Sequence, residues 1–233
     1  MTPERLVLRQ GSWRRIPLAV RYGVLQRKNH APVLLDGGWP RSHPGDSRAF
    51  RLYHRLMRAT VHEDHAPDTV VPKPESIILT HLHADHVGAL RRFPEIPAYA
   101  SAAALKGLQL RHAVFRELLG PTARFHAFED QPSVMLPHDL GHGHDILGDG
   151  SVLSVPLPGH APGHCGLYLP GDPDILYAGD TQWLLRAILE NRAPRGPARL
   201  VPSNLSAWAD SSAKVAEFAK AGGRVVLAHE PET

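Results

Sequence analysis

The stretch Thr80-His81-Leu82-His83-Ala84-Asp85-His86-Val87-Gly88 carries the strongest signal in this chain. Its pattern His-x-His-x-Asp-His places three imidazoles and one carboxylate directly after the apolar run Ser76-Ile77-Ile78-Leu79. A strand that ends in this way presents several ligands from one rigid edge of a sheet. Neutral imidazole together with carboxylate suits zinc and neighbouring divalent metals. The motif therefore predicts a metal site, although a solvated polar loop is the alternative in a chain with 16 His.

The composition is ordinary for a soluble globular protein, with 42% hydrophobic and 21% charged residues. At 233 residues we expect a single domain, residues 1–233, with a full core. The formal net charge is only +3 and the arginines are scattered, so no nucleic-acid partner is expected. No apolar run approaches a membrane span, and no signal-peptide core is present. The one cysteine, Cys165, excludes a disulfide within the chain and favours a cytoplasmic location.

Hydrophobic periodicity predicts strands interleaved with helices. Strands are expected over residues 5–9, 16–26, 32–38, 76–80, 98–100, 152–157, 166–169, 175–178 and 224–228. Helices are expected over residues 47–61, 86–93, 101–119, 181–190 and 207–221. Residues 120–150 are rich in Gly, Pro, His and Asp and are expected to form a long loop. This order suits an α+β protein, an αβ/βα four-layer sandwich with two mixed β-sheets and the helices outside.

Three further ligand-type residues follow predicted strands. His160 comes after strand 152–157, Asp180 after strand 175–178, and His229 after strand 224–228. Each one alone is more typical of a turn. Because all follow the end of an apolar strand, their side chains are expected to converge with the 81–86 motif at one sheet edge.

Together these motifs are similar to those of the metallo-β-lactamase-fold hydrolase superfamily. The resemblance rests on the 81–86 motif, Pro158-Gly159-His160-Ala161-Pro162-Gly163-His164, Gly179-Asp180 and the late His229, in that order over residues 30–230. It implies the same sandwich fold and two divalent metal ions, with zinc as the default and manganese, iron or cobalt as alternatives. The implied ligands are His81, His83 and His160 for one metal, Asp85, His86 and His229 for the other, and Asp180 bridging both.

The resemblance also implies a mechanism. A hydroxide shared by the two metals would attack the substrate, with Asp180 as the bridging ligand and Asp85 moving a proton to the leaving group. Asp36 matches a position that supports the ligands through hydrogen bonds. An Asp that begins the turn at Gly37-Gly38 is the equally weighted alternative.

Class B β-lactamases generally lack the bridging Asp, so Asp180 argues against that branch. The spacing from Asp180 to His229 and the ending Ala228-His229-Glu230-Pro231 resemble the N-acyl-homoserine lactonase-like branch. The chain departs from this branch at Trp183, where those lactonases carry a Tyr that contacts the lactone carbonyl. Trp183 is therefore interpreted either as a substrate contact or as core. We expect a hydrolase acting on a lactone or carboxylic ester. Phosphotriesterase, thioesterase and β-lactamase activities are alternatives, as is a non-catalytic zinc-binding protein.

The remaining expectations concern partners and pocket residues. We expect a small-molecule substrate and no membrane partner, and a homodimer is compatible with the sequence. Trp39, after Gly37-Gly38, is expected at the pocket mouth or in the core. The histidine-rich segment 138–145 is interpreted as a solvated loop or a lid rather than a third metal site.

Overall fold

Residues Tyr22–Ala127 build one unit of the structure around a five-stranded sheet. The computed structural model describes residues 1–107, 117–119, 124–192, 194 and 196–231 of the chain. The strands of this sheet, in spatial order, are β3 (Gly23–Leu25), β4 (Val33–Leu35), β5 (Ser76–Ile78), β6 (Pro97–Ala100) and β7 (Arg124–Ala127). Only the β3–β4 pair is antiparallel, and the other three pairs are parallel.

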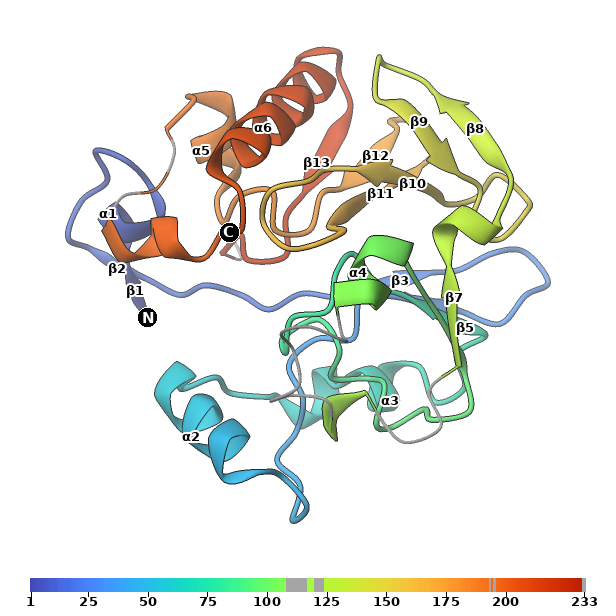
Figure 1. Ribbon diagram of the computed structural model, residues 1–233, viewed down its shortest axis with the longest axis horizontal. Coiled ribbons are helices and arrows are strands. Elements are labelled where there is room, and N and C mark those ends of the chain that lie inside the picture. The colour runs from blue at the N-terminus through green and yellow to red at the C-terminus, as the bar shows by residue number, and fades with distance from the viewer. Residues whose placement is uncertain (108–116, 120–123, 193, 195, 232–233) are drawn as a thin grey trace. The chain divides into compact units, whose positions relative to one another are not determined.

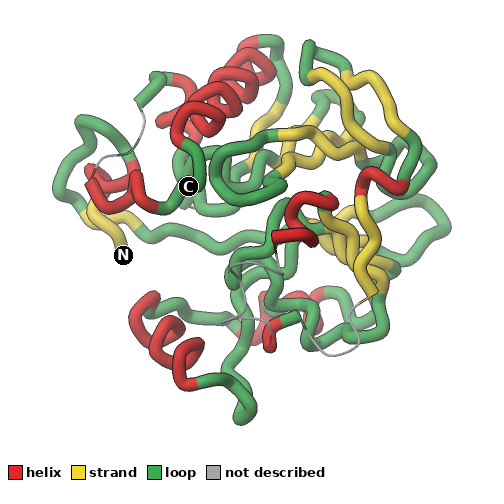
Figure 2. Tube along the Cα trace, viewed as in Figure 1, coloured by secondary structure: helices red, strands yellow, loops and turns green. Residues whose placement is uncertain are grey.

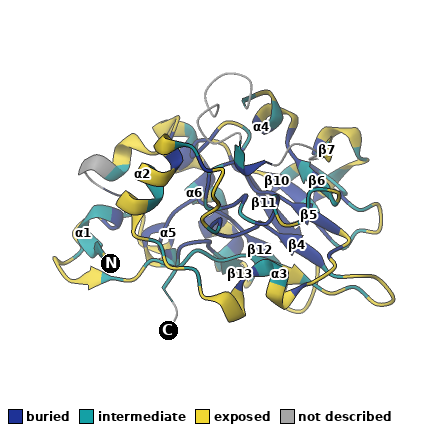
Figure 3. Cartoon of the chain, turned by 90° about the horizontal axis from the view of Figure 1, so that it is seen from below, coloured by how far each residue is buried: buried dark blue, intermediate teal, exposed yellow. Residues whose placement is uncertain are grey.

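Strands β4 and β5 are apolar, as is typical of parallel strands that are covered on both faces. Every residue of β4 and β5 is buried (Figure 3). The core joins Leu34 and Ile77 of these strands to Phe50. The helical segments of the unit are α2 (Arg48–Met57), η1 (Glu63–His65), α3 (Pro67–Val70) and α4 (Ala102–Gly107). Ser47 caps α2 by accepting a hydrogen bond from the Phe50 amide.

The second unit joins Met1–Arg21 to Phe128–Thr233 and holds a four-stranded mixed sheet. Its strands, in spatial order, are β10 (Leu153–Pro156), β11 (Cys165–Leu169), β12 (Ile175–Tyr177) and β13 (Arg224–Val226). The β10–β11 and β11–β12 pairs are antiparallel, and the β12–β13 pair is parallel. Strands β10, β12 and β13 therefore run in the same direction.

One long helix covers this sheet. In Figure 1 helix α6 (Leu205–Lys220) lies alongside the strands, where Val215 and Phe218 join Leu176 in the core. Asn204 caps this helix by accepting from the Ala207 amide. The other elements are β1 (Thr2–Pro3), α1 (Glu4–Val7), β2 (Arg15–Ile16), η3 (Phe128–Asp130), β8 (Ser133–Leu136), β9 (Gly141–His144), α5 (Leu185–Leu189) and η4 (Gly196–Leu200). Figure 2 shows how much loop separates these short elements.

Four predicted elements are wrong in the structure. The strand expected over 16–26 is not one element: its ends belong to β2 (Arg15–Ile16) and β3 (Gly23–Leu25), which lie in different sheets. Residues 4–7 form the helical turn α1, where a strand was expected over 5–9. Residues 86–93 form successive turns, with Leu90 N bonded to Val87 O and Arg92 N to Ala89 O. The expected loop 120–150 contains β7 and the β8–β9 hairpin, which turns at Pro137–Leu140.

The hairpin escaped notice because its turn has no glycine at the centre. His138 and Asp139 both have positive φ, 55° and 53°, as a type I′ turn requires.

The predicted helix 101–119 begins as α4, and its residues 108–116 lie outside the described part of the chain. Within the described residues, no helix has both the length and the apolar character that a membrane crossing requires.

Candidate functional site

The motif 81–86 lies at the carboxyl edge of the five-stranded sheet. Strands β4 and β5 are parallel neighbours, so the loops that follow them leave the same edge. Asp36 follows β4 directly and the histidine motif follows β5. The two loops approach closely: a Cβ at Gly37 would lie 2.6 Å from Ala89 N, and one at Gly88 would lie 2.5 Å from Gly38 O. Glycine at both positions allows this contact.

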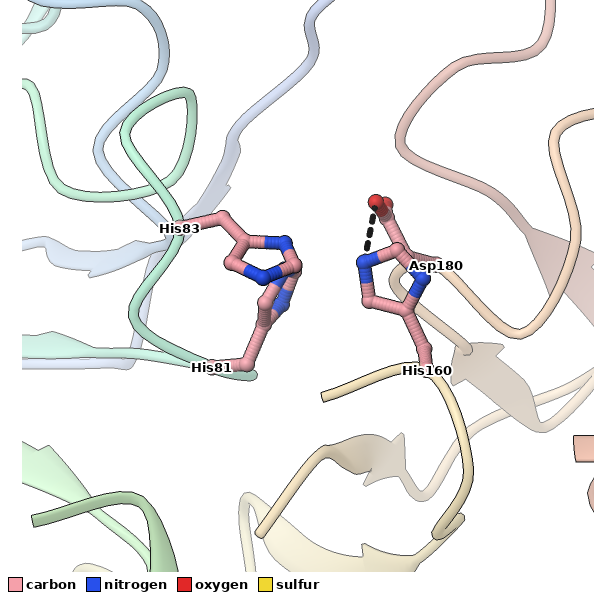
Figure 4. A group of neighbouring side chains, drawn as sticks. All are labelled: His81, His83, His160 and Asp180. Atoms are coloured by element: carbon pink, nitrogen blue, oxygen red, sulfur yellow. Dashed lines mark ion pairs between the residues drawn. The ribbon is translucent and has the colours of Figure 1, made fainter. Parts of the chain in front are cut away.

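Four predicted ligands gather in this loop. The ring centroids of His81 and His83 lie 4.5 Å apart, and those of His81 and His86 lie 4.1 Å apart. The Asp85 Oδ1 atom is 4.0 Å from His86 Nε2. His81 and His86 are buried, whereas His83 and Asp85 are half-buried. Figure 4 shows His81 and His83 extending from this one loop.

The Asp36 side chain supports this loop through hydrogen bonds. Its fully buried carboxylate accepts hydrogen bonds from Thr80 N at 2.8 Å and from the Thr80 hydroxyl, and it lies 2.8 Å from His86 Nδ1. The Thr80 hydroxyl also lies 3.1 Å from His81 Nδ1. Asp36 itself has φ 61°, so it begins the turn as well. Sequence reasoning did not single out Thr80, although it immediately precedes the motif.

These contacts show which ring nitrogen of His86 carries a proton. Its Nδ1 faces the Asp36 carboxylate, which only accepts, so Nδ1 carries the proton. The Nε2 atom of neutral His86 is then a lone-pair nitrogen, and it faces another acceptor, the Asp85 carboxylate. Two acceptors face each other here, an arrangement that a cation stabilises.

The ligands of the other unit come from three strand ends. His160 follows β10, Asp180 follows β12 and His229 follows β13. Because these strands run in one direction, the three side chains leave the sheet at one edge. Ala178 N bonds to Val226 O and Ala228 N bonds to Gly179 O, so the loops after β12 and β13 stay joined past the strands.

Asp180 lies between the two histidines. Its Oδ2 atom is 3.1 Å from His160 Nε2, the contact drawn as a dashed line in Figure 4. The same oxygen is 3.2 Å from His229 Nε2. His229 Nδ1 lies 2.7 Å from Ala19 O, so Nδ1 donates there. Neutral His229 thus also presents a lone-pair nitrogen to a carboxylate.

Two residues that were not predicted hold Asp180 in place. His164 is buried, and its Nδ1 donates to Leu157 O at 2.7 Å while its Nε2 accepts from Asp180 N at 3.0 Å. Trp208 Nε1 donates to Asp180 O at 3.1 Å. The only sequence signal for His164 was the second Pro-Gly-His of segment 158–164, and Trp208 had none.

The tryptophans singled out in the sequence are buried. Trp183 packs in the apolar cluster with Trp208, their ring centroids 5.7 Å apart. Trp39 stacks on Tyr53 at 5.7 Å in the other unit. Both placements correspond to the core interpretation of these residues.

Two histidines of segment 138–145 contact other residues of the same unit. His138 Nε2 lies 2.9 Å from Asp174 Oδ2, and His144 Nδ1 lies 3.0 Å from Gln131 O. Hydrogen bonds from Tyr168, His138 and Gly171 N lower the pKa of Asp174 to about 2. Burial and Asp174 raise the pKa of Tyr168.

The donor set suits divalent cations. The residues that could bind metal ions are His81, His83, Asp85 and His86 in one unit and His160, Asp180 and His229 in the other. The set contains only imidazole and carboxylate, a mixture typical of catalytic zinc and related centres. Within each unit a lone-pair nitrogen faces a carboxylate, so a bound cation would relieve an unfavourable contact.

Comparisons with known proteins give the relatives of this chain. Residues 20–221 match the family model of the Metallo-beta-lactamase superfamily. A probable metallo-hydrolase of Mycobacterium tuberculosis is 28% identical over 173 residues, covering 67% of this chain and 54% of that protein. The N-acyl homoserine lactonase AttM of Azorhizobium caulinodans is 28% identical over 161 residues, covering 67% and 58%. The chain thus spans little more than half the length of these relatives.

A solved structure extends the likeness to the fold. An N-acyl homoserine lactone hydrolase with N-hexanoyl-L-homoserine bound at its metal centre superposes with a TM-score of 0.68. The alignment covers 97% of this chain and 87% of that one, at 16% sequence identity.

Proposed function

The chain belongs to the metallo-beta-lactamase superfamily, and from that premise we propose that it is a metal-dependent hydrolase with two divalent cations. The predicted metallo-β-lactamase fold, with mixed sheets and helices, is confirmed by the family match and the structural likeness. His81, His83 and His160 would hold one cation, Asp85, His86 and His229 the other, and Asp180 both.

One observation carries the proposal: an imidazole lone pair faces a carboxylate in both units. In one unit this is His86 Nε2 opposite Asp85, and in the other it is His229 Nε2 opposite Asp180. Each imidazole already donates its Nδ1 proton to an acceptor. Without a cation each contact would be an ion pair only if the imidazole carried a second proton, whereas a bound divalent cation satisfies both acceptors directly.

The chemistry divides between the cations and the chain. Two bound divalent cations supply a water molecule of lowered pKa as the nucleophile and stabilise negative charge on the attacked group. The Asp36 carboxylate accepts a hydrogen bond from His86 Nδ1 and so orients the imidazole. The half-buried Asp85 carboxylate would move a proton to the leaving group. No side-chain nucleophile is required, which agrees with the burial of Cys165.

We place the substrate among lactones and carboxylic esters. The support is that several relatives and a structural neighbour are named as acting on N-acyl homoserine lactones. Trp183 has no hydroxyl and packs in the apolar cluster with Trp208, so it does not replace the Tyr hydroxyl expected in those lactonases. Two bound cations would then supply most of the stabilisation of the oxyanion, which would favour activated lactones and esters over unactivated amides.

The test combines metal content with turnover. The variant His81→Ala/His83→Ala is compared with wild type and with His62→Ala/His65→Ala, which removes two exposed histidines of the same unit. Metal per chain is measured by mass spectrometry, and turnover is measured on lactone, aryl ester, thioester, phosphotriester and β-lactam substrates. We expect two metals per chain in wild type and the control, with lactones or esters turned over faster than β-lactams.

The site variant should lose metal and turnover while keeping its fold by circular dichroism. Full retention of both would rule the proposal out. A faster β-lactam reaction in wild type would overturn the substrate class alone.

A further inference from the structure

Helix α2 exposes apolar side chains to solvent. Of its ten residues only Phe50 is buried, and much of the helix has the exposed colour in Figure 3. Leu52, Leu56 and Met57 keep 58%, 66% and 51% of their surface exposed. Single exposed apolar residues are common on proteins, so the arrangement of these side chains on the helix decides what they mean.

The helical repeat places two of them on one face. Leu52 and Leu56 are four residues apart and are therefore neighbours along the helix. At 3.6 residues per turn, Leu52 lies about 160° around the helix from Phe50, the residue that joins α2 to the core. The leucine pair consequently faces away from the unit that carries it.

Arginines flank this leucine pair. Arg48 lies four residues before Leu52 and Arg55 three residues after it, so both share its side of the helix. Both arginines are exposed, and neither forms an ion pair with a residue in the described ranges. The helix itself contains no Asp or Glu. We call Arg48, Leu52, Arg55 and Leu56 the outer face of α2.

The stability of the helix does not account for these charges. A cation in the first turn, such as Arg48, is unfavourable beside the positive end of the helix dipole, and no acidic residue in that turn offsets it. Arg51 and Arg55 are four residues apart, a spacing at which like charges repel. A negatively charged partner would remove both costs.

We propose that the outer face of α2 binds an anionic lipid surface, with the helix lying along that surface. Leu52 and Leu56 enter the apolar region below the headgroups. The guanidinium groups of Arg48 and Arg55 extend on their apolar stems to the lipid phosphates, whose geometry they match. Such binding requires no helix that crosses a membrane, and it revises the expectation of no membrane partner for peripheral contact alone.

Other occupants suit this face less well. In a two-fold pair of copies the arginines of one outer face would approach those of the other and repel them. A groove in an acidic protein would have to bury charges that lie among the leucines, at a cost in desolvation. At a lipid surface the charged heads remain in the hydrated headgroup region while the leucines are buried.

Co-sedimentation of the full chain with vesicles tests the proposal. The vesicles consist of phosphatidylcholine alone or of phosphatidylcholine mixed with phosphatidylglycerol, which is anionic. We expect wild type to bind the anionic vesicles at least about tenfold more tightly than the neutral ones, as two arginines near a charged surface should provide. Binding should weaken as added salt screens the charges.

Two double variants separate the contributions of charge and apolar surface. Arg48→Gln/Arg55→Gln and Leu52→Ser/Leu56→Ser should each lower the partition coefficient on anionic vesicles by roughly tenfold or more. All four positions are exposed, so both variants should keep the wild-type circular dichroism spectrum.

Matched controls change exposed residues elsewhere in the same unit. Lys28→Gln/Lys73→Gln removes two positive charges, and Val24→Ser/Val70→Ser removes two apolar side chains. Both controls should bind like wild type. A reporter variant, Leu56→Trp, should show fluorescence that lipids with brominated acyl chains quench more strongly than that of wild type, since its indole enters the apolar region.

Several outcomes would overturn the inference. These are wild type that binds neither vesicle, site variants that bind like wild type, and leucine variants that alter the oligomeric state in ultracentrifugation instead of lipid binding. Loss in the arginine variant alone would mean charge attraction without insertion. Binding of poly-glutamate as tight as vesicle binding would assign the face to an acidic protein. None of the predicted metal ligands lies in α2, so these outcomes leave the proposed hydrolase function untouched.

Discussion

The two units supply ligands in opposite ways. In one, four ligand-type residues lie within the loop 81–86 after a single strand, β5. In the other, His160, Asp180 and His229 follow three different strands and meet only because those strands run in one direction. The first set depends on a local loop conformation, and the second depends on the topology of a whole sheet.

The contacts that support the two ligand sets also differ in how far along the sequence they come from. Asp36 comes from the neighbouring parallel strand and holds the 80–86 segment through side-chain contacts. The other set is held by His164, by Trp208 and by the carbonyl of Ala19, which come from distant parts of the sequence. Variants of each support can therefore test whether the two units contribute separately.

The largest effect is expected at Asp180. The variant Asp180→Asn removes the charge that faces both His160 and His229. We expect kcat/KM to fall by more than about 100-fold, beyond the range typical for residues that only support ligands. The loss should include metal content, measured per chain. Asp210→Asn, an exposed carboxylate on α6, is the control, and an effect of similar size there would contradict the assignment.

A smaller effect is expected at Asp36. Asp36→Asn weakens the acceptor that orients His86 and Thr80, so metal affinity should fall by roughly 10–100-fold. Competition with a chromophoric chelator measures the dissociation constants. Asp64→Asn changes an exposed carboxylate of the same unit and should leave them unaltered. If Asp36→Asn lowers stability without changing metal affinity, Asp36 serves the turn alone.

These residues show what sequence reasoning can reach. The 81–86 motif can be recognised because its four ligands lie within six residues, and strand β5 before it is a short apolar run. Asp36 was identified because it too ends an apolar strand. His160, Asp180 and His229 were individually weak and were assigned only through a family order, since their convergence depends on strand direction.

Other features had no local signal. Every residue has a backbone carbonyl, so the sequence cannot single out that of Ala19. This carbonyl nevertheless accepts from His229 Nδ1 and so fixes the tautomer of His229. Strand β9 reads Gly-His-Gly-His and has neither apolar alternation nor β-branched residues, so pairing with β8 and a bond from His144 N to Ser154 stabilise it instead. The division into two units was also not predicted, and the single domain stays a prediction.

His164 should show how strongly the dispersed ligand set depends on its supports. His164→Phe leaves the buried Leu157 carbonyl and the Asp180 amide without their partners. We expect a loss of about 2–6 kcal/mol in unfolding free energy, at roughly 1–3 kcal/mol for each group. Urea denaturation measures it, with the exposed His142→Phe as control. A loss below that of the control would mean that the Asp180 loop is held by other contacts.

The smallest effect concerns Asp174, whose surroundings are the reverse of those around Asp180. Its carboxylate faces donors, from Tyr168, His138 and Gly171 N, and these lower its pKa from 3.8 to about 2. The unfolded state then binds more protons, so this stabilisation is complete above about pH 4 and is lost as the pH falls toward 2.

Asp174→Asn should therefore reduce the loss of stability between pH 4 and pH 2, by under about 1 kcal/mol because the pair is partly exposed. Urea denaturation at several pH values measures the difference. Because hydrogen-bond donors already satisfy the Asp174 carboxylate, a chelator should not change this pH dependence of stability. Removal of metal by the chelator should instead destabilise the unit at Asp180 and His229, where two acceptors face each other. If wild type and Asp174→Asn lose stability equally across this range, the donors around Asp174 do not stabilise its charge.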